Sequence, residues 1–217
     1  MCGILGIYNL NRSPISSTNL KLMAEKMAHR GPDGEGFYLK DEIGLAHKRL
    51  AILDISSRGA QPMSSKDGKW IITFNGCIYN YLELKLDLLS KGHEFVSTTD
   101  TEVISEGLSE YGPIFFERLN GMFAIGAWNT KEESLYLSRD RYGIKPLYYS
   151  LTNNHRGIVY SSEIKTLIET NVVEKTINLD AISSYLSFRY PYGVGNFFSK
   201  IEKVEPGEVL VFNNGNI

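Results

Sequence analysis

The second residue of the chain is a cysteine, and the only other cysteine among the 217 residues is Cys77. A cysteine attacks as its thiolate, and because a free thiol has a pKa of about 8.5, a nucleophilic cysteine needs a base nearby. If Met1 is removed, the freed α-amine of Cys2 lies on the same residue as the thiol. An α-amine has a pKa of about 7.7–8.0, so Cys2 can carry its own general base.

The alternative for Cys2 is a small buried residue without chemistry, which is common for free cysteines. The apolar, β-favouring residues 4–8 predict a buried strand that begins almost at Cys2 and fits both readings. If Met1 stays in place, the amine of Cys2 is part of a peptide bond and the base is missing. That form of the chain is expected to be inactive or very slow.

The elements that must position Cys2 are predicted from hydrophobic periodicity. Helices are expected over residues 17–29, 79–91 and 179–188, and Leu82, Leu86 and Leu89 share one face of the second. Thr99 and Glu102 have the spacing of a capping box, which predicts another helix start. Further strands are predicted at residues 37–39, 43–53, 70–74, 122–128, 135–139, 147–150, 157–161 and 208–212.

The order of these elements predicts the fold class. Strands come early and late with a few helices between them, and strand and helix do not alternate as they do in a parallel sheet. The sequence therefore predicts an α+β protein with largely antiparallel sheets, in one domain.

Composition excludes several function classes. Hydrophobic residues make up 42% and charged residues 22%, and the net charge is −2, so no basic excess points to nucleic acid. No apolar run is long enough for a membrane span, and the N-terminus lacks the basic region of a signal peptide. Two cysteines give no disulfide framework, and no Cys/His group has metal-site spacing. We therefore expect a cytoplasmic protein with no metal site.

Nine short motifs, in order along nearly the whole chain, resemble class II glutamine amidotransferases, and the last two resemble the asparagine synthetase branch in particular. They are Cys2-Gly3-Ile4, Arg30-Gly31-Pro32-Asp33, His47-Lys48-Arg49-Leu50-Ala51-Ile52, Phe74-Asn75-Gly76, Ile78-Tyr79-Asn80-Tyr81, Thr99-Asp100-Thr101-Glu102, Leu119-Asn120-Gly121-Met122-Phe123-Ala124, the run from Ser138 to Tyr149 and Ser161-Ser162-Glu163-Ile164-Lys165.

The resemblance implies an N-terminal nucleophile hydrolase fold, a four-layer α-β-β-α sandwich, with residues 1–217 as the glutamine amidotransferase type 2 domain. It also implies glutamine as substrate. The thiol of Cys2 would attack the side-chain amide, form a γ-glutamyl thioester and release ammonia, and water would then release glutamate. Asn75 and Gly76 match the oxyanion hole, where an amide side chain and a backbone N–H stabilise the negative oxygen. The same dipeptide is also a common hairpin turn.

The substrate-binding residues implied by the resemblance are Arg49, Leu50, Ile52 and Asp100. Arg49 would bind the α-carboxylate through its guanidinium fork, and Asp100 the α-ammonium. The simpler alternative for Arg49 is a surface arginine, and the simpler alternative for Asp100 is a helix cap. Cys77 departs from the family, which usually has glutamate at this place. Because a cysteine cannot supply that charge, the resemblance implies a raised KM for glutamine with the chemistry retained.

The family continues into an ATP-dependent synthetase domain, and its Ser-Gly-Gly-x-Asp-Ser loop does not occur in this sequence. We therefore expect no cofactor here. ATP and Mg²⁺ would bind to a synthetase domain supplied in cis or in trans. That domain would also recognise the acceptor of the ammonia. Two alternatives stay open: an amidotransferase with another carboxylate acceptor, and a degenerate module that binds glutamine without hydrolysing it.

Overall fold

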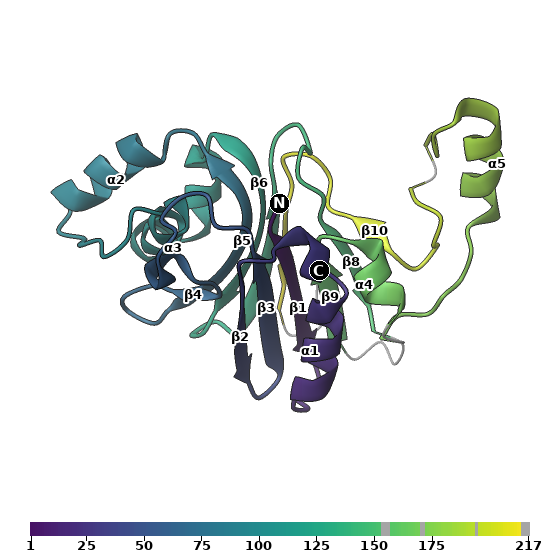
Figure 1. Ribbon diagram of the computed structural model, residues 1–217, viewed down its shortest axis with the longest axis horizontal. Helices are drawn as coiled ribbons and strands as arrows, with labels where there is room; N and C mark the ends of the chain where they lie inside the picture. Colours follow the sequence, from purple (N-terminus) through teal and green to yellow (C-terminus); the bar gives the residue numbers. More distant parts are fainter. Residues whose placement is uncertain (153–156, 170–171, 194, 214–217) are drawn as a thin grey trace.

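The computed structural model describes residues 1–152, 157–169, 172–193 and 195–213. Two antiparallel sheets form its centre (Figure 1). The larger sheet has the order β10 (Glu202–Lys203), β8 (Tyr148–Leu151), β9 (Gly157–Ser161), β1 (Gly3–Asn9), β3 (Ile43–Arg49) and β2 (Gly34–Lys40). The smaller sheet has the order β11 (Val209–Phe212), β7 (Ser134–Arg139), β6 (Gly121–Asn129), β5 (Trp70–Ile78) and β4 (Met63–Ser64).

Three apolar clusters place the helices on the outer faces of the sheets. One cluster lies between the two sheets. A second joins the smaller sheet to α2 (Tyr81–Ser90) and α3 (Asp100–Tyr111), and a third joins the larger sheet to α1 (Ser17–Glu25) and α4 (Ile164–Ile168). The order helix, sheet, sheet, helix confirms the predicted α-β-β-α sandwich.

The first strand shows how the sequence produces these layers. Side chains along a strand alternate between its two faces. In β1, Ile4 and Tyr8 therefore join the cluster between the sheets, whereas Leu5 and Ile7 join the cluster under α1. A strand buried on both faces needs an uninterrupted apolar sequence, and this strand carries Cys2 immediately before its first residue.

Two predicted strand boundaries are wrong. The strand expected over residues 43–53 ends at Arg49, and the strand expected to end before Asn75 continues to Ile78. Gly76 explains the continuation, because a Cβ there would lie 2.2 Å from the carbonyl oxygen of Met122 on β6. The glycine lets two paired strands approach closely, and the Asn-Gly pair is not a turn.

The buried face of helix α2 is not the one that the spacing of its leucines suggests. Leu82, Leu86 and Leu89 do share a face, but that face is exposed, and the buried leucines are Leu84 and Leu88. Leu84 and Leu88 belong to the apolar cluster that also contains residues of α3, η3 (Gly112–Arg118) and the smaller sheet. Helix α3 begins as predicted, since the Thr99 side chain accepts a hydrogen bond from the backbone N–H of Glu102 at 3.2 Å.

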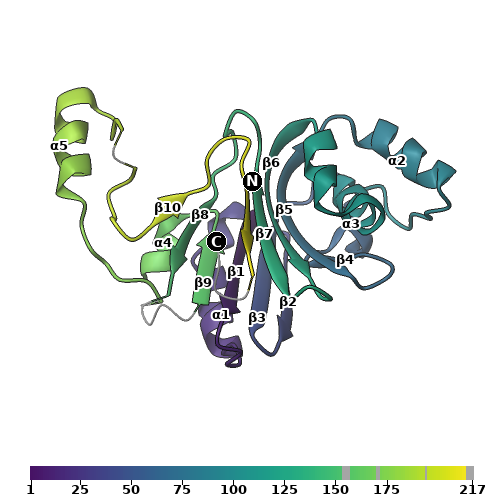
Figure 2. The same cartoon turned by 180° about the vertical axis from the view of Figure 1, so that it is seen from behind.

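Helix α5 (Leu179–Phe188) stands away from the sheets, at the right of Figure 1 and at the left of the rear view in Figure 2. Ala181 is its one buried residue. None of the helices in the described ranges is long and apolar enough to cross a membrane.

Candidate active site

The thiol of Cys2 lies at one end of the strands of the larger sheet, where β1 begins and its neighbour β3 ends. Its Sγ is 3.4 Å from the backbone nitrogen of Leu50, which donates to it, and 3.6 Å from the carbonyl oxygen of the same residue. Gly3 pairs with Lys48 in the ladder between β1 and β3, and this register places Leu50 beside Cys2. Both cysteines of the chain, Cys2 and Cys77, are free.

A cavity of about 270 Å³ opens beside this thiol. All eight residues expected in the site line it: Cys2, Arg49, Leu50, Ile52, Asn75, Gly76, Cys77 and Asp100. They come from both sheets and from the start of α3, so residues distant in sequence meet only because the two sheets pack face to face. The volume suits a small molecule rather than a macromolecule.

Asn75 supplies an unpaired donor to the cavity wall. The residue is 2% exposed, and its side-chain Nδ2 has no hydrogen-bond partner among the described residues. A buried amide N–H is normally paired, so Asn75 Nδ2 is a candidate hydrogen-bond donor for a ligand or an intermediate bound in the cavity.

The guanidinium of Arg49 is fixed by the loop that follows β3. Nη1 donates to the carbonyl oxygen of Ser56 at 2.8 Å, and Nη2 donates to the carbonyl oxygen of Asp54. Gly59 lies so close that a Cβ there would be 2.3 Å from Nη2. Arg49 is thus an oriented cation in the cavity wall and not a freely moving surface arginine.

Asp100 faces the same cavity from the first turn of α3. It is 4% exposed, and burial raises its pKa from 3.8 to about 6, against hydrogen bonds from backbone N–H groups that lower it. Burial also raises the pKa of Cys77, and the negative charge of Asp100 adds to that effect. Cys77 is therefore a neutral thiol at pH 7 beside a titratable carboxylate.

His47 lines the cavity but is a poor candidate for a base. It is 1% exposed, and burial lowers its pKa from 6.5 to about 4. The ring is neutral at physiological pH, as expected of a packed histidine.

Lys145 also lines the cavity, and the sequence analysis did not select it. It is 7% exposed, and its Nζ lies 3.4 Å from the sulfur of Met1. Its backbone is fixed by two neighbours: its N–H donates to Asp140 at 3.0 Å, and its carbonyl accepts from Arg139 Nε at 2.7 Å. The run from Ser138 to Tyr149 that contains it was identified only as a family motif, and its residue Lys145 lines the cavity.

Residues 30–33 hold the backbone on both sides of the thiol through two hydrogen bonds. Arg30 Nε donates to the carbonyl oxygen of Cys2 at 2.9 Å, and Asp33 accepts from the backbone N–H of Ala51 at 2.8 Å. Among the described residues, no group of three or more His, Cys, Asp or Glu side chains is placed to hold a metal ion.

The fold has solved neighbours that share it. A glutamine phosphoribosylpyrophosphate amidotransferase from B. subtilis, complexed with ADP and GMP, matches 98% of this chain and 47% of its own, with a TM-score of 0.72 and 19% sequence identity. This likeness shows that the chain has the expected N-terminal nucleophile hydrolase fold.

The sequence matches the family described as a glutamine amidotransferase domain over residues 1–217, and the chain belongs to that family. Asparagine synthetase [glutamine-hydrolyzing] 1 of Bacillus subtilis is 37% identical over 213 residues, which are 95% of this chain and 33% of that protein. Amidase chry2 of Gibberella zeae is 31% identical over 223 residues, 97% of this chain and 32% of that protein. The chain spans about a third of the length of these relatives.

Proposed function

We propose that this chain, once Met1 has been removed, carries out the glutaminase half-reaction of an asparagine synthetase-like amidotransferase. The carrying observation is that Cys2, Asn75, Arg49 and Asp100 line one cavity, and that Asn75 Nδ2 is buried without a hydrogen-bond partner among the described residues. A nucleophile, an oxyanion donor and one group of each charge are what hydrolysis of an amino-acid side-chain amide requires.

In the proposed reaction the α-amine of Cys2 takes the thiol proton, and Sγ attacks the side-chain carbonyl carbon of glutamine. The oxyanion that forms is stabilised by Asn75 Nδ2 and the backbone N–H of Gly76. The protonated amine gives its proton to the leaving nitrogen, ammonia departs, and a γ-glutamyl thioester remains. Water, deprotonated by the same amine, attacks the thioester and releases glutamate.

Substrate orientation follows from the charges in the wall. The α-carboxylate of glutamine would pair with the fixed guanidinium of Arg49, and the α-ammonium with the carboxylate of Asp100. Leu50 and Ile52 would contact the substrate from the segment that follows β3. No cofactor takes part in this half-reaction.

The ammonia would pass to an ATP- and Mg²⁺-dependent synthetase domain, in cis or in trans, in a cytoplasmic protein without a nucleic-acid or membrane partner. An acceptor that is converted to asparagine is favoured, because relatives named asparagine synthetases match almost the whole chain. The match to Amidase chry2 keeps another carboxylate acceptor as the second candidate.

Intact-mass analysis before and after treatment with 6-diazo-5-oxo-norleucine tests the half-reaction. The expected result is a starting mass without Met1, followed by one adduct that maps to Cys2 and is absent in Cys2→Ala. A processed chain that takes no adduct would instead support the non-catalytic glutamine-binding module.

A further inference from the structure

The Ser-Ser-Glu motif at residues 161–163 lies beside β1, the strand that begins directly after Cys2. Strand β9 pairs with β1 from Asn9 to Leu5, and Ser162 continues this pairing past the end of the ladder. Its N–H donates to the carbonyl oxygen of Ile4 at 2.9 Å, and its hydroxyl accepts from the N–H of Ile4 at 3.1 Å. The next side chain along the motif, Glu163, is therefore carried to the level of Cys2.

Arg30 connects this motif to the nucleophile. Its Nε donates to the Cys2 carbonyl at 2.9 Å, and its Nη1 donates to Glu163 Oε1 at 2.9 Å. The Arg30 side chain is only 8% exposed. A buried guanidinium needs a counter-charge, and Glu163 is its ion-pair partner among the described residues. The exposed His29 contacts the same carboxylate oxygen at 2.9 Å.

The hydrogen bond from Arg30 to the Cys2 carbonyl oxygen matters most in the chain from which Met1 has been removed. Without Met1, Cys2 is held by a single peptide bond and lies before the first residue of β1. The position of Cys2 relative to the fixed strand then depends on the orientation of the Cys2–Gly3 peptide plane, which can rotate about the N–Cα bond of Gly3. A hydrogen bond to the Cys2 carbonyl oxygen, which lies in this plane, restricts that rotation, and it can do so only while the guanidinium keeps its place.

We propose that Glu163 is a positioning residue for Cys2, acting through the guanidinium of Arg30. The catalytic part of this proposal rests on the proposed function. Glu163 does not line the cavity, so its loss leaves the groups that bind glutamine in place and misaligns the nucleophile. The effect therefore falls on kcat and on the reactivity of the thiol, with the KM for glutamine unchanged.

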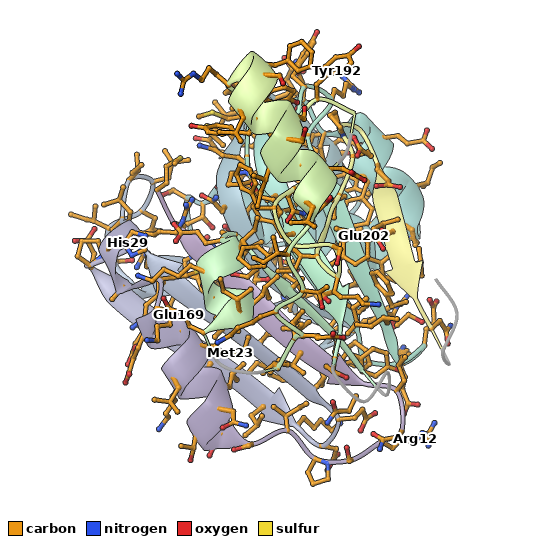
Figure 3. The ribbon with its side chains drawn as sticks, turned by 90° about the vertical axis from the view of Figure 1, so that its right-hand side faces the viewer. Arg12, Met23, His29, Glu169, Tyr192 and Glu202 are labelled. Atoms are coloured by element: carbon orange, nitrogen blue, oxygen red, sulfur yellow. The ribbon has the colours of Figure 1, made fainter. Side chains whose placement is uncertain are left out.

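The chain provides a matched control. Glu169 follows α4 and pairs with Lys26 at 2.9 Å, and both side chains of that pair are about 40% exposed. Figure 3 shows Glu169 and His29 at separate places on the same side of the molecule. Glu169→Gln removes the same charge from an ion pair that has no connection to Cys2.

Steady-state glutaminase kinetics are compared for wild type, Glu163→Gln, Glu163→Ala and Glu169→Gln, each with Met1 removal checked by mass and folding checked by melting temperature. We expect kcat to fall about tenfold in Glu163→Gln and about a hundredfold in Glu163→Ala, with an unchanged KM. Glu169→Gln should match wild type. A kcat in Glu163→Ala equal to that of Glu169→Gln, or a loss confined to KM, would overturn the proposal.

A second readout does not depend on glutaminase activity. The rates at which iodoacetamide alkylates Cys2 and Cys77 are followed by peptide mass mapping, with Cys77 as the internal reference. Glu163→Ala is expected to slow alkylation of Cys2 relative to Cys77, and Glu169→Gln is not. A wild type that releases no glutamate would contradict the proposed function, whereas equal alkylation ratios in all variants would contradict the positioning role.

Discussion

The carboxylate of Asp100 accepts a hydrogen bond from the backbone N–H of Ile78 at 2.9 Å, which ties the first turn of α3 to the last residue of β5. Cys77 immediately precedes Ile78, so this bond places Asp100 next to the position where the family usually has a glutamate. Because residue 77 is a cysteine, Asp100 is the one carboxylate among the described residues of the cavity lining. In the proposed function, binding of the substrate ammonium would therefore depend on a single negative charge.

Restoring a second charge tests this consequence. Cys77→Glu is expected to lower the KM for glutamine about ten- to a hundredfold, because one charge-assisted hydrogen bond contributes about 1.5–3 kcal/mol. The kcat should change little, since Cys2 and Asn75 are untouched. Glutamate release at varied glutamine concentration measures both constants.

Cys77→Gln is the control, because glutamine has the size of glutamate without its charge. Its KM should stay near that of wild type. An unchanged KM in Cys77→Glu would mean that the ammonium is bound elsewhere or that Asp100 alone saturates the interaction.

The raised pKa of Asp100 predicts a pH dependence of substrate binding. With a pKa of about 6, the carboxylate is charged at pH 7 and loses its charge as the pH falls. The KM for glutamine should therefore rise about tenfold between pH 7 and pH 5. Measuring KM across this range in wild type and in Asp100→Asn checks the assignment, because the variant should have a high KM that varies little with pH.

The same shift makes a prediction about stability. Because the folded-state pKa lies above the ordinary value of 3.8, folding favours the protonated acid, and stability is lost as the pH rises through about 6. Asp100→Asn keeps an acceptor for Ile78 but carries no charge. It should melt at a higher temperature than wild type at pH 7, and an equal or lower melting temperature would argue against a desolvated charge at this position.

The unpaired amide of Asn75 gives a fourth prediction. Asn75→Leu should lower kcat about 10²–10³-fold, the usual effect of removing one oxyanion donor, without lowering the melting temperature. Stability is retained because the buried Nδ2 has no partner to lose. Asn129 is the matched control: it is 1% exposed, and its side chain accepts from the N–H groups of Lys131 and Glu132 at 3.0 Å. Asn129→Leu should lower the melting temperature, and a similar loss in Asn75→Leu would contradict the oxyanion role.

The fold class was predicted from the pattern of elements, whereas the four-layer sandwich was implied by the family resemblance. The antiparallel α+β class follows from the order of the predicted elements, because strands come early and late without the strand–helix alternation of a parallel sheet. The residues of the site came instead from motif resemblance, since no periodicity brings Asn75 to Cys2. Their presence in one cavity wall depends on the packing of one sheet against the other.

The wrong predictions share a physical cause, which is that tertiary packing overrides local pattern. Asn75-Gly76 has the local chemistry of a turn, yet close approach to β6 uses the glycine within a strand. Leu82 and Leu86 have the spacing of a buried stripe, yet the sheet lies on the other side of α2. The burial of Lys145 in the cavity wall was also missed, because it depends on the buried Arg139 and Asp140 that shape its loop.

A final prediction concerns His93, which links the loop after α2 to α3. Its Nδ1 lies 2.9 Å from Glu106 Oε2 and its Nε2 lies 3.2 Å from Glu110 Oε2. Burial lowers the pKa of His93, but the hydrogen bonds and charges of the two glutamates outweigh this effect and raise it above 6.5. The folded state therefore binds the proton more tightly than the unfolded chain, and the resulting stability is present below the unfolded pKa and lost as the pH rises through the folded pKa.

His93→Gln keeps a hydrogen-bonding side chain without a titrating charge. The difference in unfolding free energy between wild type and His93→Gln, measured by urea titration, should be largest near about pH 5.5 and should shrink toward about pH 8.5. A difference that stays constant would show that His93 acts by packing alone. A difference that grows with pH would require the neutral ring to be the stabilising form, with its charged form disfavoured by burial.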